Sequence, residues 1–256
     1  MNKSKLSILM DKRIYNYINT WKTQKNVIGI LVCGSHATKL SRPDSDVDLR
    51  ILYSENQENS RKKGVKTFEN LSFSYLTGTV RDYLTTLHNQ FFRQSKFEAR
   101  MFALGVILFD SEDELKKLSK KANSLLELAY EAPSENLLLL KKYMLSNHYN
   151  FFIKLHKDAP LWKYHYFQFI DHIFKAYSFF IGFETPSVEK LNRVLFDDTY
   201  NKVNNFEEYP DSTFLELWQK AINSETEKFI IHVELLYAHV QKKWGQFNPN
   251  DFEAYI

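Results

Sequence analysis

The spacing of hydrophobic residues changes near residue 133, and this change constrains the fold more than any other feature of the sequence. Before it, the β-branched runs Val27–Cys33 and Val47–Tyr53 predict buried strands between helical segments. After it, nearly every segment has helical spacing, beginning at Ser134, a predicted helix cap. The sequence therefore predicts an α+β fold in which an N-terminal mixed β-sheet with flanking helices precedes an all-α helical bundle.

Hydrophobic spacing also predicts the remaining helices and strands. A helix is expected from Asp11 to about Lys25, and a third strand over Phe68–Leu76. The polar stretch 55–66 between the second and third strands predicts an exposed loop. Helical spacing resumes after Thr79 and again after Asp113. We place the domain boundary at the change in pattern, giving domains 1–132 and 133–256.

Composition excludes several classes of protein. The 256 residues include only 7 Gly and 6 Pro, which disfavours a turn-rich all-β fold and a disordered chain. Cys33 is the only cysteine, so an intramolecular disulfide is impossible. No apolar stretch reaches the roughly 18 residues that a membrane span needs. A cytoplasmic protein without membrane association is expected.

The formal net charge of +3 is unevenly distributed. Residues 1–130 carry a balance of +7, and residues 131–256 carry −4. A basic half suits an anionic ligand such as a nucleotide. Nucleic-acid-binding surfaces show a stronger basic bias, so nucleic acid is not the expected partner.

The segment between the first two strands carries the residues best suited to chemistry. Side chains two apart on a strand share a face, so Asp46, Asp48 and Arg50 are expected to point the same way. Two adjacent carboxylates repel each other unless a cation lies between them, and their oxygens suit Mg²⁺ or Mn²⁺. Gly34 and Ser35, at a predicted strand-to-helix turn, can direct N–H groups and a hydroxyl at an anion.

Each part of this segment, taken alone, also has a simpler interpretation. Gly-Ser alone and Asp-x-Asp alone are each common in ordinary turns and loops. The acids Asp44, Asp46 and Asp48 also resemble the start of a calcium-binding loop, but Leu49 stands where that loop requires glycine. The combination of a strand, Gly-Ser, a short linker, Arg-Pro-Asp-Ser-Asp-x-Asp and a second strand is much more specific than any of its parts.

This combination resembles the signature of the DNA polymerase beta-type nucleotidyltransferase superfamily, in its small bacterial, aminoglycoside nucleotidyltransferase-like branch. The matching residues are Gly34, Ser35, Arg42, Pro43, Asp44, Ser45, Asp46, Asp48 and Leu49. The resemblance implies that Asp46 and Asp48 are catalytic residues that hold the metal. It implies that Gly34 and Ser35 bind the nucleotide phosphates, with Arg42 either assisting them or forming a structural ion pair.

The sequence departs from the family pattern in two ways. His36, Thr38 and Lys39 replace residues that are usually basic or glycine. Active members also carry a third carboxylate on a neighbouring strand, whereas the strand predicted here presents Asn70, Ser72 and Ser74 on that face. The third acid is therefore missing or comes from elsewhere in the chain.

The resemblance implies a Mg²⁺-dependent transfer of a nucleoside monophosphate, AMP from ATP, to a hydroxyl of an acceptor. The helical half would form the other wall of a cleft, and its charge predicts a small hydroxylated acceptor, helped by an acidic group at Asp197, Asp198, Glu207, Glu208 and Asp211. Two alternatives remain open: a non-catalytic nucleotide-binding or regulatory protein, and a toxin–antitoxin partner. The sequence leaves a homodimer open as well.

Overall fold

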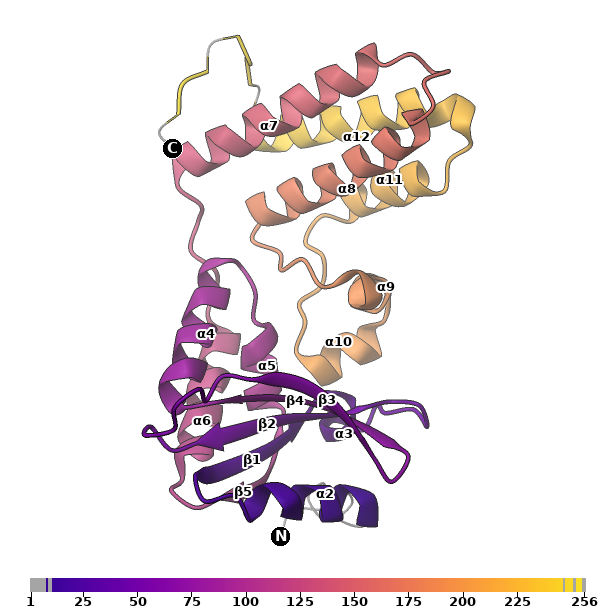
Figure 1. Cartoon of the computed structure of the whole chain (residues 1–256). Coiled ribbons are helices and arrows are strands. Elements are labelled where there is room, and N and C mark those ends of the chain that lie inside the picture. The colour runs from indigo at the N-terminus through magenta and orange to yellow at the C-terminus, as the bar shows by residue number, and fades with distance from the viewer. Residues whose placement is uncertain (1–7, 9–10, 246, 251, 255–256) are drawn as a thin grey trace. The chain divides into compact units, whose positions relative to one another are not determined.

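A computed structural model describes residue 8 and residues 11–245, 247–250 and 252–254 of the chain. The chain forms two compact units. Unit 1 contains Met1–Ala129 and Asp197–Phe206, and unit 2 contains Tyr130–Phe196 and Glu207–Ile256. The expected α+β fold class is confirmed: a mixed sheet lies in the N-terminal part, and the rest of the chain is helical (Figure 1).

Unit 1 is built on a five-stranded mixed sheet with the order β3-β4-β2-β1-β5. The strands are β1 (Val27–Cys33), β2 (Val47–Tyr53), β3 (Lys63–Phe68), β4 (Leu71–Gly78) and β5 (Val106–Asp110). Only β2 and β4 pair in parallel; the other neighbours are antiparallel. The two strands predicted with the strongest apolar runs, β1 and β2, therefore lie in the interior of the sheet.

Helices cover both faces of this sheet. Helix α2 (Lys12–Lys22) packs Ile14, Tyr17 and Ile18 against one face. The other face is covered by α4 (Val80–Phe92), α5 (Phe97–Ala103) and α6 (Glu114–Glu127) (Figure 1). Because side chains alternate along a strand, β2 sends Val47, Leu49, Ile51 and Tyr53 to the α2 side and Asp48, Arg50 and Leu52 to the other side.

Two predictions about the strands are wrong. The expected loop 55–66 contains most of β3, and the expected third strand Phe68–Leu76 crosses the turn of a β3–β4 hairpin at Glu69 and Asn70, both with positive φ. Strand β3 lies at the edge of the sheet, where lysines are common and no apolar alternation is required. Strand β5 was not predicted, because a five-residue apolar run between helices does not distinguish strand from helix.

Unit 2 is a bundle of helices with an aromatic core. Its helices are α7 (Glu135–Lys154), α8 (Trp162–Phe180), α9 (Val188–Phe196), α11 (Ser212–Ile222), the 3₁₀ turn Thr226–Lys228 and α12 (Phe229–Trp244). Ser134 caps α7 as predicted, accepting a hydrogen bond from the Leu137 amide at 3.3 Å. Tyr166 stacks on Phe229 with ring centroids 3.6 Å apart, and both side chains are buried.

The short segment Asp197–Phe206, which contains α10 (Asp198–Asn204), packs with unit 1 although the residues on both sides of it belong to unit 2. The Arg100 guanidinium of α5 lies 3.7 Å from the centre of the Phe206 ring, and Arg100 is buried. The predicted acidic group is therefore divided: Asp197 and Asp198 belong to unit 1, whereas the other three acids belong to unit 2. No helix in the described part of the chain is long and apolar enough to cross a membrane.

Candidate active site

The turn that ends β1 is built around Gly34. The strand ends at Cys33 in an extended conformation, and Gly34 follows with φ +65°, at the start of the short helix α3 (Gly34–Thr38). Lys39 ends this helix in the left-handed conformation, and the Leu40 amide donates to the Ser35 carbonyl at 2.9 Å. Positive φ favours glycine, so the backbone alone accounts for glycine at position 34.

Gly34 also lies against a predicted metal ligand. A Cβ atom on Gly34 would collide with Oδ2 of Asp48 and would lie only 3.2 Å from its Cγ atom. The two residues are brought together by the β1–β2 ladder, in which Cys33 pairs with Asp48. The absence of a side chain on Gly34 therefore allows the Asp48 carboxylate to lie against the turn that carries Ser35.

The linker from α3 to β2 ends in a tight turn at Arg42–Ser45. The Ser45 amide donates to the Arg42 carbonyl at 3.0 Å, and the Ser45 hydroxyl accepts from the Arg42 amide at 2.8 Å. Pro43 occupies the second position of this turn, where its fixed φ is favourable. Arg42 is exposed, and no ion pair of its side chain is found among the described residues. Within this part of the chain, the structural ion pair considered for Arg42 is not seen.

On the face of β2 opposite to α2, the exposure of the side chains decreases along the strand. Asp46, just before the strand, is exposed; Asp48 is half-buried; Arg50 and Leu52 are buried. Helices α4 and α5 cover the Arg50 end and leave the carboxylates at the open end. The structure thus places Asp48 next to the Gly34–Ser35 turn, with Asp46 two residues before it.

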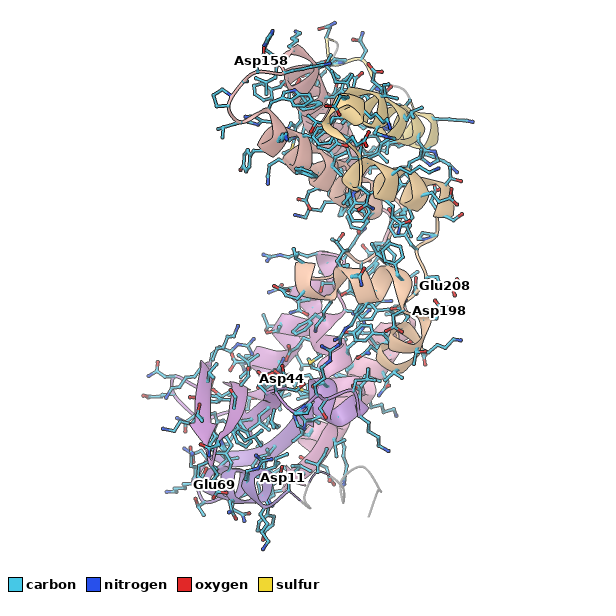
Figure 2. The ribbon with its side chains drawn as sticks, turned by 90° about the vertical axis from the view of Figure 1, so that its right-hand side faces the viewer. Asp11, Asp44, Glu69, Asp158, Asp198 and Glu208 are labelled. Atoms are coloured by element: carbon cyan, nitrogen blue, oxygen red, sulfur yellow. The ribbon has the colours of Figure 1, made fainter. Side chains whose placement is uncertain are left out.

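The position next to Asp48 on the neighbouring strand is occupied by Ser74. Strands β2 and β4 pair in parallel with Asp48 opposite Ser74, so both side chains lie on the same face. Glu69, the nearest acid in sequence, accepts a hydrogen bond from Asn16 of α2 at 3.2 Å. Figure 2 shows Glu69 at the α2 side of unit 1, away from Asp44. The third carboxylate expected for an active family member is not on β4.

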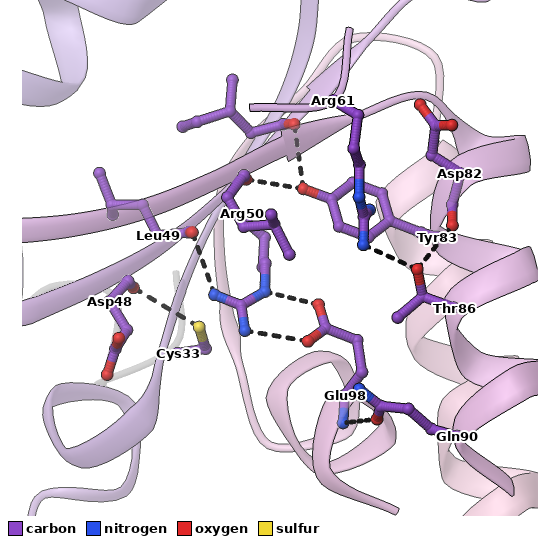
Figure 3. Close-up of polar contacts among 12 residues, drawn as sticks. Cys33, Asp48, Leu49, Arg50, Arg61, Asp82, Tyr83, Thr86, Gln90 and Glu98 are labelled. Atoms are coloured by element: carbon purple, nitrogen blue, oxygen red, sulfur yellow. Dashed lines mark hydrogen bonds and ion pairs between the residues drawn. The ribbon is translucent and has the colours of Figure 1, made fainter. Parts of the chain in front are cut away.

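Sequence reasoning missed one buried residue close to this site, Glu98 of α5. It binds the Arg50 guanidinium through both oxygens, with Nε–Oε1 and Nη2–Oε2 distances of 2.5 and 3.0 Å (Figure 3). Burial by itself would lower the pKa of Arg50, but neighbouring groups, including the Glu98 carboxylate, raise it above its ordinary value. Nothing in the local sequence signals this pair, because its members are 48 positions apart.

The residues present fit a divalent cation held by two carboxylates. Asp46 and Asp48 would offer hard oxygen ligands, and glycine at position 34 allows the Asp48 carboxylate to lie where a Cβ atom would collide with its Oδ2. Within the described residues, no group of three or more His, Cys, Asp or Glu side chains is arranged to hold a metal. The α8 histidines have other contacts: His172 Nδ1 lies 3.0 Å from His148 Nδ1, and the His165 ring packs on Phe151.

The part of the chain that carries this site matches a known protein domain. Residues 14–132 match the family model of the nucleotidyltransferase domain. A search of curated proteins found no match. Among solved structures, a nucleotidyltransferase-like protein from Exiguobacterium sibiricum 255-15 is 13% identical, with 91% of this chain and 75% of that chain covered and a TM-score of 0.47. The family match includes every predicted site residue, and it supports nucleotidyl transfer as the general function; such domains use a nucleoside triphosphate and a divalent metal.

Proposed function

We propose that the protein is a nucleotidyltransferase that moves AMP from ATP to a hydroxyl of a small acceptor. The observation that carries this proposal is the contact between Gly34 and the Asp48 carboxylate. It joins the turn suited to phosphates to the strand that carries Asp48 and that directly follows Asp46. Neither the Gly-Ser turn nor the pair of acids would support the proposal alone.

Each residue of the site has a defined role in this proposal. The Ser35 hydroxyl and the backbone at Gly34 hold the terminal phosphates, and the exposed Arg42 adds positive charge next to them. Asp46 and Asp48 hold Mg²⁺ or Mn²⁺. The bound metal would neutralise charge on the triphosphate and on the leaving pyrophosphate.

The reaction proceeds by attack of the acceptor oxygen on the α-phosphorus. A new oxygen–phosphorus bond forms, the bond from the α-phosphorus to the bridging oxygen breaks, and pyrophosphate leaves with that electron pair. In the proposed reaction the hydroxyl proton passes to solvent, and β4 places Ser74 rather than an acid beside Asp48. The chain's own contribution is therefore to bind and align the reactants.

We propose that residues 1–132 are the nucleotidyltransferase domain and that the helical residues 133–256 bind the acceptor. The charge balance of −4 over residues 131–256 disfavours a phosphate backbone as acceptor. A small, hydroxylated and uncharged or cationic molecule fits this charge better.

A second candidate function is a nucleotide-binding protein without catalytic activity. Ser74 favours it, because this residue stands beside Asp48 where active members of the resembled family carry an acid. Such a protein would bind ATP with a metal but would not release pyrophosphate.

The test is to incubate the protein with Mg²⁺ and ATP labelled at the α-phosphate, together with a pool of hydroxylated metabolites and aminoglycosides or, separately, total tRNA. Label on a small molecule with release of pyrophosphate is expected. Asp48→Asn should abolish transfer, whereas the matched control Asp44→Asn, which removes an exposed acid from the preceding turn, should retain it. Label on tRNA alone would contradict the proposed acceptor. ATP binding without any pyrophosphate release would favour the second candidate.

A further inference from the structure

The buried pair Arg50–Glu98 lies directly behind the proposed metal ligand Asp48. Arg50 is two residues after Asp48 on the same face of β2, and the Arg50 and Glu98 side chains are only 7% and 2% exposed. The guanidinium and the carboxylate are joined by two hydrogen bonds. A planar guanidinium bound in this way fixes direction as well as distance.

Side chains of this region hold the backbone on the C-terminal side of Asp48. Arg50 Nη1 donates to the Leu49 carbonyl at 3.2 Å, and the Cys33 thiol donates to the Asp48 carbonyl at 3.6 Å (Figure 3). Two successive carbonyl groups therefore receive side-chain hydrogen bonds. Cys33 of β1 therefore holds the peptide that joins Asp48 to Leu49, and the Arg50 side chain holds the next peptide, which joins Leu49 to Arg50.

The helices that hold this network are themselves fixed to the sheet. The Glu98 amide donates to Gln90 Oε1 of α4 at 2.8 Å. The hydroxyl of Tyr83, also on α4, donates to the carbonyls of Ile51 in β2 and Leu76 in β4, at 3.2 and 2.7 Å. Burial raises the pKa of Tyr83, so its hydroxyl stays protonated as a donor. Figure 3 shows Asp48 on one side of Arg50 and Glu98, Gln90 and Tyr83 on the other.

Stability alone does not account for such a pair. Replacing a buried ion pair by apolar residues of similar size is often neutral or stabilising, because desolvation offsets the attraction between the charges. The Arg50–Glu98 pair can instead fix the orientation of Asp48. Residues that orient a metal ligand strongly affect the affinity for the metal. We infer that Arg50 and Glu98 are positioning residues that fix Asp48 for the metal–nucleotide complex. This inference rests on the proposed function.

The test compares stability, local mobility and nucleotide binding in one set of variants. The double variant Arg50→Met/Glu98→Leu removes both charges and keeps similar volumes. Its thermal midpoint should stay within about 4 °C of the wild type. Amide exchange at Asp48–Arg50 should become about tenfold faster relative to Ile30 in β1. The affinity for ATP with Mn²⁺ should fall about 10- to 100-fold.

Arg13→Met is the matched control, because it removes an arginine of α2 from a partly exposed ion pair with Asp11, the residue that caps this helix. It should change neither exchange at Asp48–Arg50 nor nucleotide affinity. If the double variant does not fold, Arg50→Lys keeps the charge but loses the planar fork, and the same local changes are expected from it.

Unchanged exchange at Asp48–Arg50 in the folded variant would show that the pair only fills the interior, and would overturn the inference. The exchange measurement requires no metal. It therefore decides the inference even if the wild type binds no ATP with Mn²⁺, a result that would contradict the proposed function instead.

Discussion

At the scale of single residues, two positions beside Asp48 define the site: position 34 carries no side chain, and position 74 carries a serine instead of an acid. Gly34 combines a positive φ with a close approach to Asp48. Ser74 places a small hydroxyl beside the same carboxylate. Each position therefore allows a substitution that changes the surroundings of Asp48 directly.

Gly34→Ala should destabilise the protein and remove metal-dependent nucleotide binding. Positive φ costs a residue with a Cβ atom about 1–2 kcal/mol, and the added methyl would displace the Asp48 carboxylate. Gly182→Ala is the matched control, since Gly182 has φ +72° but nothing lies within 4 Å of the added carbon. Chemical unfolding should show a loss of similar size in both variants. Calorimetry should show weaker ATP binding with Mg²⁺ for Gly34→Ala alone, and equal affinities would disprove the role of this contact.

Ser74→Asp should make stability depend on metal. A new carboxylate beside Asp48 adds like-charge repulsion, which a divalent cation relieves. Without metal, the unfolding free energy should fall by about 1 kcal/mol, and Mn²⁺ should raise the thermal midpoint more than in the wild type. Val65→Asp is the control, because Val65 pairs with Ser74 but lies one strand further away and is 69% exposed. An identical response to Mn²⁺ in both variants would count against a metal at Asp48.

At the scale of elements, the sequence predicted best those segments whose partners are close in the chain. The strands that carry Cys33 and Asp48 have strong apolar runs, and α7 begins at the predicted cap Ser134. Edge strand β3 could not be predicted, because its exposed residues show no apolar pattern. The contact of Glu98 with Arg50 could not be predicted either, because it depends on tertiary structure. The packing of α10 with unit 1 could not be predicted either, because this helix begins 71 residues after the end of α6.

Phe206→Leu should loosen the α10 segment. The Phe206 ring lies against the Arg100 guanidinium, and Arg100 Nε donates to the Asn205 carbonyl at 3.4 Å. Leucine keeps apolar volume but loses the cation–π attraction, which contributes about 0.5–2 kcal/mol. Amide exchange over 198–206 should therefore accelerate, while exchange in α6 should remain unchanged. Unchanged exchange over 198–206 would show that other contacts hold the segment.

At the scale of the whole molecule, the two units differ in the interactions that stabilise the interior of each. Unit 1 relies on a sheet packed between helices, whereas unit 2 relies on aromatic packing and a polar cluster around Asp211. Asp211 caps α11 and accepts hydrogen bonds from the Tyr177 hydroxyl and His239 Nε2, at 2.5 and 2.9 Å. One acid of the predicted acidic loop is therefore a structural residue of the bundle.

The Asp211 cluster predicts how stability depends on pH. Burial would raise the pKa of Asp211, but hydrogen bonds from Tyr177 and His239 outweigh it and lower the pKa to about 2. Because the folded pKa is below the unfolded one, the carboxylate contributes about 2 kcal/mol above pH 4, and this is lost as pH falls through about 2. Urea unfolding at pH 5 and 2.5 should show a smaller loss for Asp211→Asn than for the wild type. The exposed Asp158→Asn should behave as the wild type does, and equal losses in all three proteins would exclude this role of Asp211.

The central claim is that Asp46 and Asp48 hold a divalent metal that binds the nucleotide. Calorimetric titration of ATP, with and without Mg²⁺, into the wild type and Asp46→Asn/Asp48→Asn tests it most directly. The wild type should bind ATP more tightly with Mg²⁺, whereas the double variant, still folded because less like charge is present, should bind it equally weakly in both conditions. The same metal-dependent gain in affinity in both proteins would contradict the claim.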